Sequence, residues 1–367
     1  MLKAGIIGLP NVGKSTLFNA ITNANSLVAN YPFATIEPSF GIVELLDDRL
    51  NQLAKQIKPD KVVYATIMFV DIAGLVKNAS KGEGLGNKFL SNIREVDCLI
   101  HVVRCFDNKN ITHVHNHVDP VNDIETINLE LIISDLEIVD NRINKIKRKY
   151  ESGDRTVVVE YELLTKIKKT LELNQMLDLS EYTQEELTII KNFNLLTAKP
   201  RIYVGNINDK YLTDPLKSSH VQALADFCQK HSEQYLTISA EIEQEISNFF
   251  GQGKELEEIT ELFGIKETGL NKIAFKAYEM LGLCTFFTCG KKEVRAWTFK
   301  KNSLAPTCAG IIHSDLERGF IKAEVIYWSD LIQYGSELKA KEAGKLRLEG
   351  KQYVVRDGDV ITFKFNI

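Results

Sequence analysis

The chain has 367 residues, of which 44% are hydrophobic and 26% are charged, and its formal net charge is −4. This length predicts two or three domains, and this composition excludes a mainly disordered chain. The sequence contains no apolar run of about eighteen residues, which excludes a membrane-spanning helix, and its start lacks the pattern of a signal peptide. We therefore expect a cytosolic protein.

Short apolar runs alternate with helical patterns along the first part of the chain. These runs occupy residues 4–7, 66–70, 98–103, 201–204 and 235–238. Short apolar runs that are bounded by turns and separated by helices are typical of buried strands in a mostly parallel sheet. The sequence therefore predicts an α/β fold with a mostly parallel sheet.

Residues 122–198 interrupt this alternation. Apolar residues recur there at spacings of three and four, as in the seam of a coiled coil, and a break at residues 152–154 precedes a second helical pattern. Two helices joined by a short turn predict an inserted antiparallel hairpin. The alternative is two helices packed on the sheet. The hairpin is favoured because four basic residues crowd its tip: Lys145, Lys147, Arg148 and Lys149.

After Gly282 the sequence pattern changes to short strand patterns, at residues 293–299, 322–326 and 359–365. This change predicts a small α+β domain. From Leu281 onward the chain carries 14 Lys and Arg against 10 Asp and Glu, so this end is basic while the rest is acidic. A basic end suits an anionic partner such as RNA, although a merely solvated surface has the same composition. The predicted domains are 1–121 with 199–281, then 122–198, then 282–367.

The strongest motif is Gly8-Leu9-Pro10-Asn11-Val12-Gly13-Lys14-Ser15, between an apolar strand and a helix. Two glycines let successive backbone N–H groups turn toward phosphate oxygens, and the start of the helix adds its positive dipole end. In such a loop Lys14 reaches the β- and γ-phosphates, and the Ser15 hydroxyl is a ligand of Mg²⁺. This pattern predicts a P-loop nucleoside triphosphatase.

Two further segments follow the phosphate loop in the order in which nucleotide-sensing enzymes carry their switch and metal-binding motifs. Asp71-Ile72-Ala73-Gly74 ends the second apolar strand, where an aspartate holds Mg²⁺ through water and a glycine N–H contacts the γ-phosphate. Thr35 lies between the two phosphate motifs, where a switch threonine completes the Mg²⁺ shell. The predicted metal ligands are therefore Ser15, Thr35 and Asp71.

The residue after Gly74 is Leu75, where Ras-like enzymes carry a glutamine that orients water. An isobutyl group cannot do this, so another residue must. His113, His115 and His117 follow the third strand at alternating positions. One of them acting as the catalytic group, a metal site and ordinary surface histidines are the three alternatives, and the metal site is disfavoured because no carboxylate or cysteine completes it.

A base-recognition motif is expected at Asn206-Ile207-Asn208-Asp209, directly after a strand. In the related Asn-Lys-x-Asp motif the aspartate accepts hydrogen bonds from guanine and the lysine stem packs on the base. Here Ile207 replaces that lysine while Asp209 keeps a carboxylate. Farther along, Ser239-Ala240-Glu241 resembles the Ser-Ala-Lys element that shapes a base pocket.

With these residues the chain resembles the YchF, or Obg-like ATPase, family of P-loop proteins related to translation-factor GTPases. The resemblance spans essentially the whole chain. It is carried by the phosphate loop through Thr16 and by residues 30–33, 71–76, 82–89, 102–106, 292–297 and 350–359. It implies a G-type nucleotide-binding domain, an inserted helical hairpin and a C-terminal TGS domain with a β-grasp fold.

The resemblance also implies site residues and a role. The family's catalytic histidine falls on His113, whereas His115 and His117 do not match that position; Lys14 of the phosphate loop is the other catalytic residue expected. The expected nucleotide-binding residues are Asn11, Val12, Gly13, Lys14, Ser15, Thr16, Gly74, Asn206, Ile207, Asp209, Ser239, Ala240 and Glu241. One departure concerns the base motif, which in the family ends in glutamate rather than in an aspartate such as Asp209.

The function predicted is a Mg²⁺-dependent ATPase that hydrolyses ATP to ADP and phosphate and binds the 70S ribosome through its large subunit, as a monomer. The alternative is a GTPase or dual-specificity switch whose product is a nucleotide-gated complex with RNA or the ribosome. A metabolic kinase is disfavoured because the motifs follow the order found in G proteins and no arginine-rich lid is present.

Overall fold

Two six-stranded sheets organise the computed structural model, which describes residues 2–25, 40–72, 85–113, 117–251, 256–265 and 267–366. The chain divides into two units. Residues 2–42 and 68–273 form the larger unit, and residues 43–67 and 274–367 form the C-terminal unit. Each unit has its own sheet and is described separately.

The sheet of the larger unit has the strand order β2-β4-β1-β5-β6-β7, and each pairing from β4 to β7 is parallel. This confirms the α/β fold that the apolar runs predicted. The strands are β2 (Phe40–Glu44), β4 (Thr66–Asp71), β1 (Lys3–Ile7), β5 (Cys98–Arg104), β6 (Arg201–Asn206) and β7 (Tyr235–Ile238). Because neighbours run in one direction, the carboxyl ends of β1, β4, β5 and β6 meet at a single edge of the sheet.

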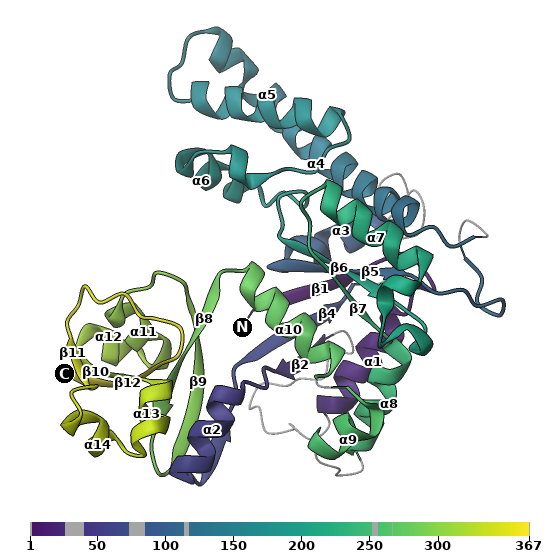
Figure 1. The fold of residues 1–367 in the computed structure, drawn as a ribbon. Helices are drawn as coiled ribbons and strands as arrows, with labels where there is room; N and C mark the ends of the chain where they lie inside the picture. The colour runs from purple at the N-terminus through teal and green to yellow at the C-terminus, as the bar shows by residue number, and fades with distance from the viewer. Residues whose placement is uncertain are drawn as a thin grey trace. The chain divides into compact units, whose positions relative to one another are not determined.

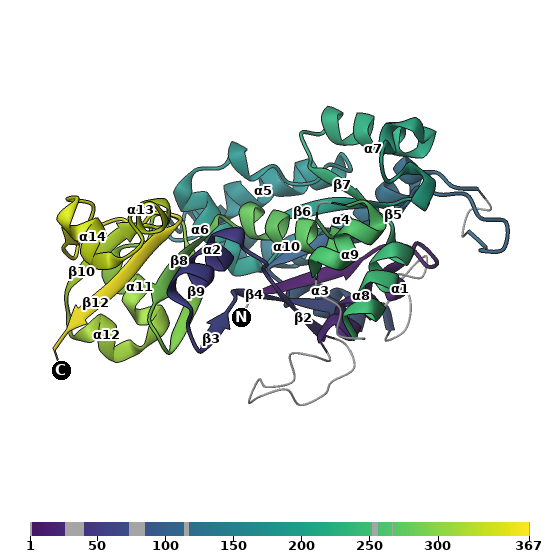
Figure 2. The ribbon, with the colours of Figure 1, turned by 60° about the horizontal axis from the view of Figure 1, so that its bottom comes forward.

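Helices cover both faces of this sheet. Helix α1 (Lys14–Asn25) packs on α8 (Ala240–Gly251), and α4 (Pro120–Glu151) packs on α7 (Ser219–Lys230). Figure 2 shows the strands between these two helix pairs. The unit also contains α3 (Leu85–Arg94), α9 (Leu256–Phe263) and the first five residues of α10 (Gly269–Met280), whose remainder belongs to the C-terminal unit.

The inserted segment forms the helical hairpin expected from its apolar spacing. Helix α4 begins with Asp119 as its N-cap and ends near Ser152, and α5 (Val158–Glu172) packs back along it (Figure 1). The hairpin has a hydrophobic core of its own, in which Val139 and Ile146 of α4 meet Leu164 and Ile167 of α5. The short α6 (Gln184–Phe193) contributes Ile190 to that core.

The sheet of the C-terminal unit has the order β11-β10-β12-β8-β9-β3. Its core gathers aromatic and small side chains, among them Phe286, Phe299 and Ala309. The elements are α2 (Asp48–Ile57), β3 (Lys61–Val63), β8 (Leu283–Cys289), β9 (Glu293–Lys300), α11 (Ala305–Ile312), α12 (Ser314–Arg318), β10 (Phe320–Tyr327), α13 (Trp328–Tyr334), α14 (Glu337–Glu342), β11 (Arg347–Glu349) and β12 (Asp359–Phe365).

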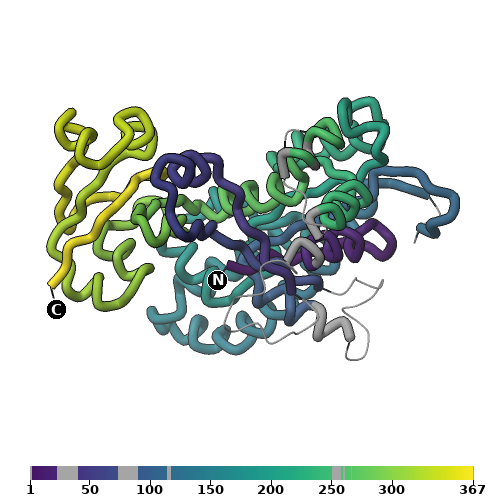
Figure 3. Tube along the Cα trace, turned by 90° about the horizontal axis from the view of Figure 1, so that it is seen from below, coloured from purple at the N-terminus to yellow at the C-terminus, as the bar shows by residue number. Residues whose placement is uncertain are grey.

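The grouping of residues 43–67 differs from the predicted boundaries, which placed them in the nucleotide-binding domain. Strand β3 pairs in parallel with β9, and α2 packs against β8, β9 and α13. Figure 3 shows this dark blue segment beside the yellow and green C-terminal segments. Pairing between residues more than 200 positions apart leaves no local trace in the sequence, so composition alone could not reveal it.

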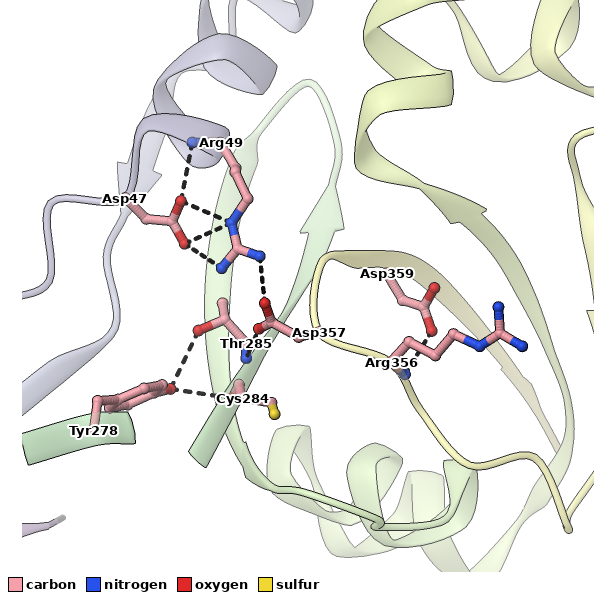
Figure 4. A network of polar contacts seen from close by, with 8 residues as sticks. All are labelled: Asp47, Arg49, Tyr278, Cys284, Thr285, Arg356, Asp357 and Asp359. Carbon is pink, nitrogen blue, oxygen red and sulfur yellow. Dashed lines mark hydrogen bonds and ion pairs between the residues drawn. The ribbon is translucent and has the colours of Figure 1, made fainter. Parts of the chain in front are cut away.

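Arg49 fastens this segment to the C-terminal sheet (Figure 4). Its guanidinium donates to Asp47 and, over 2.6 Å, to Asp357, whose other oxygen accepts from the Thr285 N–H at 2.8 Å. Burial lowers the pKa of Arg49, but its hydrogen bonds to the two carboxylates outweigh burial and raise that pKa above its ordinary value. The contacts therefore hold a permanent cation between α2 and the turn before β12.

Among the described residues, no helix combines the length and apolar character needed to cross a membrane.

Candidate functional site

The phosphate loop lies at the carboxyl end of β1 and requires glycine at two positions. At Gly8, where φ is +153°, an added Cβ would lie 2.4 Å from the Val102 carbonyl oxygen. At Gly13, where φ is +103°, it would lie 2.2 Å from the Asn206 amide nitrogen. Because both distances are far below van der Waals contact, only glycine lets the loop pass this close to β5 and β6.

Lys14 begins α1 and is almost fully buried, with 7% of its surface exposed. Its ammonium donates to the Leu9 carbonyl oxygen over 2.6 Å, a bond that folds the side chain back across the loop. Burial lowers the pKa of Lys14 to about 8, and the charge of Asp71 partly opposes this shift. Burial likewise raises the pKa of Asp71, and Lys14 opposes that. The loop therefore holds a poorly solvated cation that an anionic ligand would stabilise.

Asn206, the last residue of β6, joins the phosphate loop to the base-recognition segments. Its side-chain nitrogen donates to the Val12 carbonyl oxygen at 2.9 Å, and its side-chain oxygen accepts from the Ala240 N–H at 3.0 Å. The side chain is 5% exposed, so both bonds are shielded from water. Beside it, the Ser239 hydroxyl donates to Asp209. These contacts bring the three predicted nucleotide motifs into one site.

A cavity of about 600 Å³ opens between these motifs, within the range of small-molecule sites. Its lining includes ten residues predicted from the sequence: Asn11, Gly13, Lys14, Ser15, Thr16, Asn206, Ile207, Ser239, Ala240 and Glu241. Five lining residues were not among the predicted site residues, although Asn208 lies inside the expected base-recognition motif: Phe106, Asn108, Ile111, Asn208 and Gln244. The first three follow β5, and the rule that ligands lie at the carboxyl ends of parallel strands was a signal for them.

Other predicted residues lie near this cavity without lining it. Val12 is buried and contributes its carbonyl oxygen to Asn206, Asp209 contacts Ser239, and Asp71 ends β4 in register with Ile6. Thr35, Gly74, Leu75 and His115 lie outside the described residues.

His113 is not among the residues that line the cavity. Its Nε2 lies 3.0 Å from an Asp123 carboxylate oxygen in the first turn of α4, and both side chains are nearly buried. The preceding Thr112 carbonyl oxygen accepts from the Asn11 side chain at 3.2 Å, so the phosphate loop touches the segment that carries the histidine. His117 is exposed.

Two predicted ligands of Mg²⁺ lie within the described residues. Ser15 presents an exposed hydroxyl in the first turn of α1, and Asp71 ends the neighbouring β4 close enough to influence Lys14. A hydroxyl and a carboxylate are the hard oxygen donors that Mg²⁺ prefers, so these two residues fit the ion. Elsewhere in the described ranges, no three His, Cys, Asp or Glu side chains gather into a metal cluster.

Comparisons with known proteins agree with this arrangement. A family model described as a 50S ribosome-binding GTPase matches residues 3–160, and a model of the YchF GTPase C-terminal region, described as a protein of unknown function, matches residues 283–366. The chain is 51% identical to the ribosome-binding ATPase YchF of Bacillus subtilis, over 100% of both chains. The chain belongs to the YchF family.

Further YchF relatives are similar along their whole length. The ribosome-binding ATPase YchF of Mycoplasma genitalium is 52% identical over 100% of both chains, and that of Escherichia coli O157:H7 is 46% identical over 100% of this chain and 99% of its own. The solved structure of the Schizosaccharomyces pombe YchF GTPase superposes with a TM-score of 0.86 at 35% identity, covering 99% of this chain and 97% of that one. The family fold therefore extends over the entire chain.

The lowered pKa of Lys14 makes nucleotide binding depend on pH. Above pH 8 the ligand-free lysine is mostly neutral, and a bound phosphate restores its charged form, so binding takes up a proton. We expect close to one proton taken up at pH 9 and almost none at pH 7, with affinity falling up to about tenfold per pH unit above 8. Calorimetry in two buffers of different ionisation enthalpy measures this uptake.

The lowered pKa of Lys14 also makes the stability of the ligand-free protein depend on pH. Between pH 8 and its ordinary value of 10.5, Lys14 binds fewer protons in the folded than in the unfolded chain, so the ligand-free protein gains stability from this residue as pH rises. Equal proton uptake at pH 7 and pH 9 would contradict the assignment of Lys14 to the phosphate.

Proposed function

We propose that this protein is a Mg²⁺-dependent ATPase that converts ATP to ADP and phosphate slowly and binds the ribosome as a nucleotide-controlled regulator in the cytosol. The observation that carries the proposal is the single cavity to which both the phosphate loop and the Asn206 segment contribute. Relatives of about 50% identity over the full chain are named ribosome-binding ATPases.

At the phosphate end, the backbone of Gly13 and the start of α1 offer N–H groups to the β- and γ-phosphates. Lys14 supplies the positive charge that these groups need, and its bond to Leu9 is the one it would exchange for phosphate oxygens. Bound Mg²⁺ would be held by Ser15, Thr35 and Asp71 and would neutralise phosphate charge as the β–γ bond breaks.

At the base end, apolar side chains replace the features that select guanine. Phe106, Ile111 and Ile207 line the cavity and provide flat or aliphatic surfaces for a purine ring. Ile207 has neither the long stem nor the charge of a lysine. One Asp209 oxygen accepts from Ser239, which leaves less of the carboxylate for guanine N–H groups. These features favour adenine, and the carboxylate of Asp209 favours some residual binding of GTP.

Catalysis in this proposal uses His113 as the group that orients the attacking water. The segment from Phe106 to His113 borders the cavity, and its Thr112 carbonyl is bonded to the phosphate loop. In the described conformation the imidazole pairs with Asp123, so hydrolysis requires that His113 leave this partner. Basal turnover is therefore expected to be low.

For the ribosome, the features that support binding are basic surfaces. The tip of the α4–α5 hairpin exposes Lys145, Lys147, Arg148 and Lys149, and the C-terminal residues from 281 carry a net positive charge. Lysine and arginine in such clusters neutralise RNA phosphates, and the release of the counterions that were condensed on the RNA favours binding. We propose that the hairpin and residues 282–367, as a TGS domain, contact the large subunit, and that the protein acts as a monomer.

The nucleotide preference is tested by competition. ATP and GTP are titrated separately against a fluorescent adenine nucleotide with Mg²⁺ present. We expect ATP to bind more tightly than GTP, because Ile207 cannot pack along guanine as a lysine stem does. A GTP affinity tenfold above that of ATP, about 1.4 kcal/mol, would make the protein a GTPase instead.

The catalytic role is tested by His113→Ala, with His117→Ala as the matched control. We expect the first variant to reduce kcat by about 10²-fold or more while the dissociation constant for ATP changes less than twofold. His117→Ala, at an exposed position in the same segment, should keep the parent rate. Hydrolysis by His113→Ala at that rate would show that another group orients the water.

Ribosome binding is tested by co-sedimentation with large subunits, with a non-hydrolysable ATP analogue, with ADP and without nucleotide. We expect more protein in the pellet with the analogue, and less of a variant in which Lys145, Arg148 and Lys149 become glutamate. Replacement of the exposed Lys230 on α7 is the control for a general charge effect. Unchanged sedimentation of the triple variant would remove the hairpin tip from the contact surface.

A further inference from the structure

Arg104 is the largest fully buried side chain described in the chain, with 1% of its surface exposed. It ends β5, and its guanidinium turns into the loop of residues 105–113 that follows. Nε donates to the Phe106 carbonyl oxygen at 3.1 Å, Nη1 to that of Ile111 at 3.2 Å, and Nη2 to that of Asn108 at 3.2 Å. One side chain thus binds three carbonyl groups of a single loop.

This loop contains no helix or strand, so individual contacts determine its shape, among them the hydrogen bonds of the Cys105 N–H to the Asn206 carbonyl and of the Asp107 carboxylate to His220. The Arg104 guanidinium also lies over the Phe106 ring, 4.7 Å from the ring centre. Within the loop, the Asn110 N–H donates to the Asn108 side chain at 2.9 Å, and the Ile111 N–H donates to the Asn108 carbonyl at 3.2 Å. Arg104 therefore joins three separate positions of the loop through one guanidinium group.

The three residues whose carbonyl groups Arg104 binds are also the three through which the loop lines the nucleotide cavity. The loop ends at His113. We propose that Arg104 is a positioning residue that shapes residues 105–113 into one wall of the nucleotide cavity and sets the distance from that wall to His113. This inference rests on the proposed function, since it assigns to Arg104 the geometry on which ATP binding and hydrolysis both depend.

A buried guanidinium is an expensive way to fill space. Burial lowers the pKa of Arg104 from its ordinary value, and the charges of Asp107 and Asp123 oppose that shift. An apolar side chain of similar volume would avoid this cost but would remove the guanidinium donors from the Phe106 and Ile111 carbonyl groups and leave the Asn108 carbonyl with the Ile111 N–H alone. A lysine would keep the charge but lacks the planar fork that reaches several acceptors at once. The geometry of the loop therefore depends on arginine itself.

The test compares Arg104→Lys and Arg104→Gln with Arg201→Lys in the full chain. Arg201 is a partly buried arginine at the amino end of β6, the end away from Asn206, and it bonds Glu233 and the Thr197 carbonyl. It controls for the loss of a buried arginine that does not touch the loop. Each variant is first melted, and all assays are run well below its melting temperature.

We expect both Arg104 variants to bind a non-hydrolysable ATP analogue at least tenfold more weakly and to lose at least tenfold in kcat. The two losses arise separately, because the wall contacts the bound nucleotide and His113 acts on water. Arg201→Lys should lower the melting temperature while affinity and kcat stay within twofold of the parent. Hydrogen exchange at Asn110 and Ile111 should accelerate in the Arg104 variants, while β5 stays protected.

Parent-like affinity, kcat and loop exchange in Arg104→Lys would overturn the inference and leave the proposed function intact. Failure of the parent protein to bind or hydrolyse ATP would overturn the proposed function, and the exchange measurements would still report on the loop. If Arg104→Lys does not fold, the neutral Arg104→Gln is judged by the same criteria. Should neither fold, exchange in the parent decides: a loop as unprotected as a free peptide overturns the inference.

Discussion

The nucleotide site depends first on the amide of Asn206. Its two buried hydrogen bonds, to Val12 and to Ala240, connect segments that lie almost 200 residues apart in one case and 34 in the other. A buried amide that lost either partner would leave a polar group unsatisfied, at a cost of about 1–3 kcal/mol. Gly13 makes room for this amide, because any side chain at position 13 would occupy the place of the Asn206 amide. These two bonds consequently join the phosphate loop directly to the base segments.

Local sequence predicted the parts of the site whose function follows from backbone conformation or from one motif. Gly8 to Ser15, Asn206 and Ser239 were found because strand, loop and helix follow one another within a few residues. The placement of α2 and β3 was missed because it depends on pairing with β9 and on the Arg49–Asp357 bond. In the loop after β5, His113 was predicted, whereas the role of Arg104 was missed for a different reason. A single arginine at a strand end gives no sign of whether its guanidinium turns back into its own loop.

The site contains two buried cations, Lys14 and Arg104. Lys14 in the phosphate loop and Arg104 at the end of β5 are both cations with little access to water, and burial lowers the pKa of each. Their partners in the ligand-free protein are mainly neutral carbonyl groups: Leu9 for Lys14, and loop carbonyls for Arg104. Such partners compensate a cation only in part. Lys14 can exchange the Leu9 carbonyl for a phosphate oxygen, so this cation is suited to bind the ligand. Arg104 is enclosed, so its charge is suited to fix the shape of the loop after β5.

The pairing of His113 with Asp123 gives a physical reason for slow chemistry in the proposed ATPase. A hydrogen bond to a charged group contributes about 1.5–3 kcal/mol, so releasing the imidazole without compensation would slow hydrolysis by roughly 10- to 100-fold. That cost falls if a partner holds α4 in a position where Asp123 no longer reaches the loop. Asp123 lies in the first turn of α4, and the same helix ends at the basic hairpin tip. A partner that binds the tip therefore acts on the helix that carries Asp123. Helix α4 thus carries the partner of His113 near one end and the proposed RNA-binding surface near the other, so in the proposed function a displacement of this helix would change both the His113–Asp123 pair and turnover.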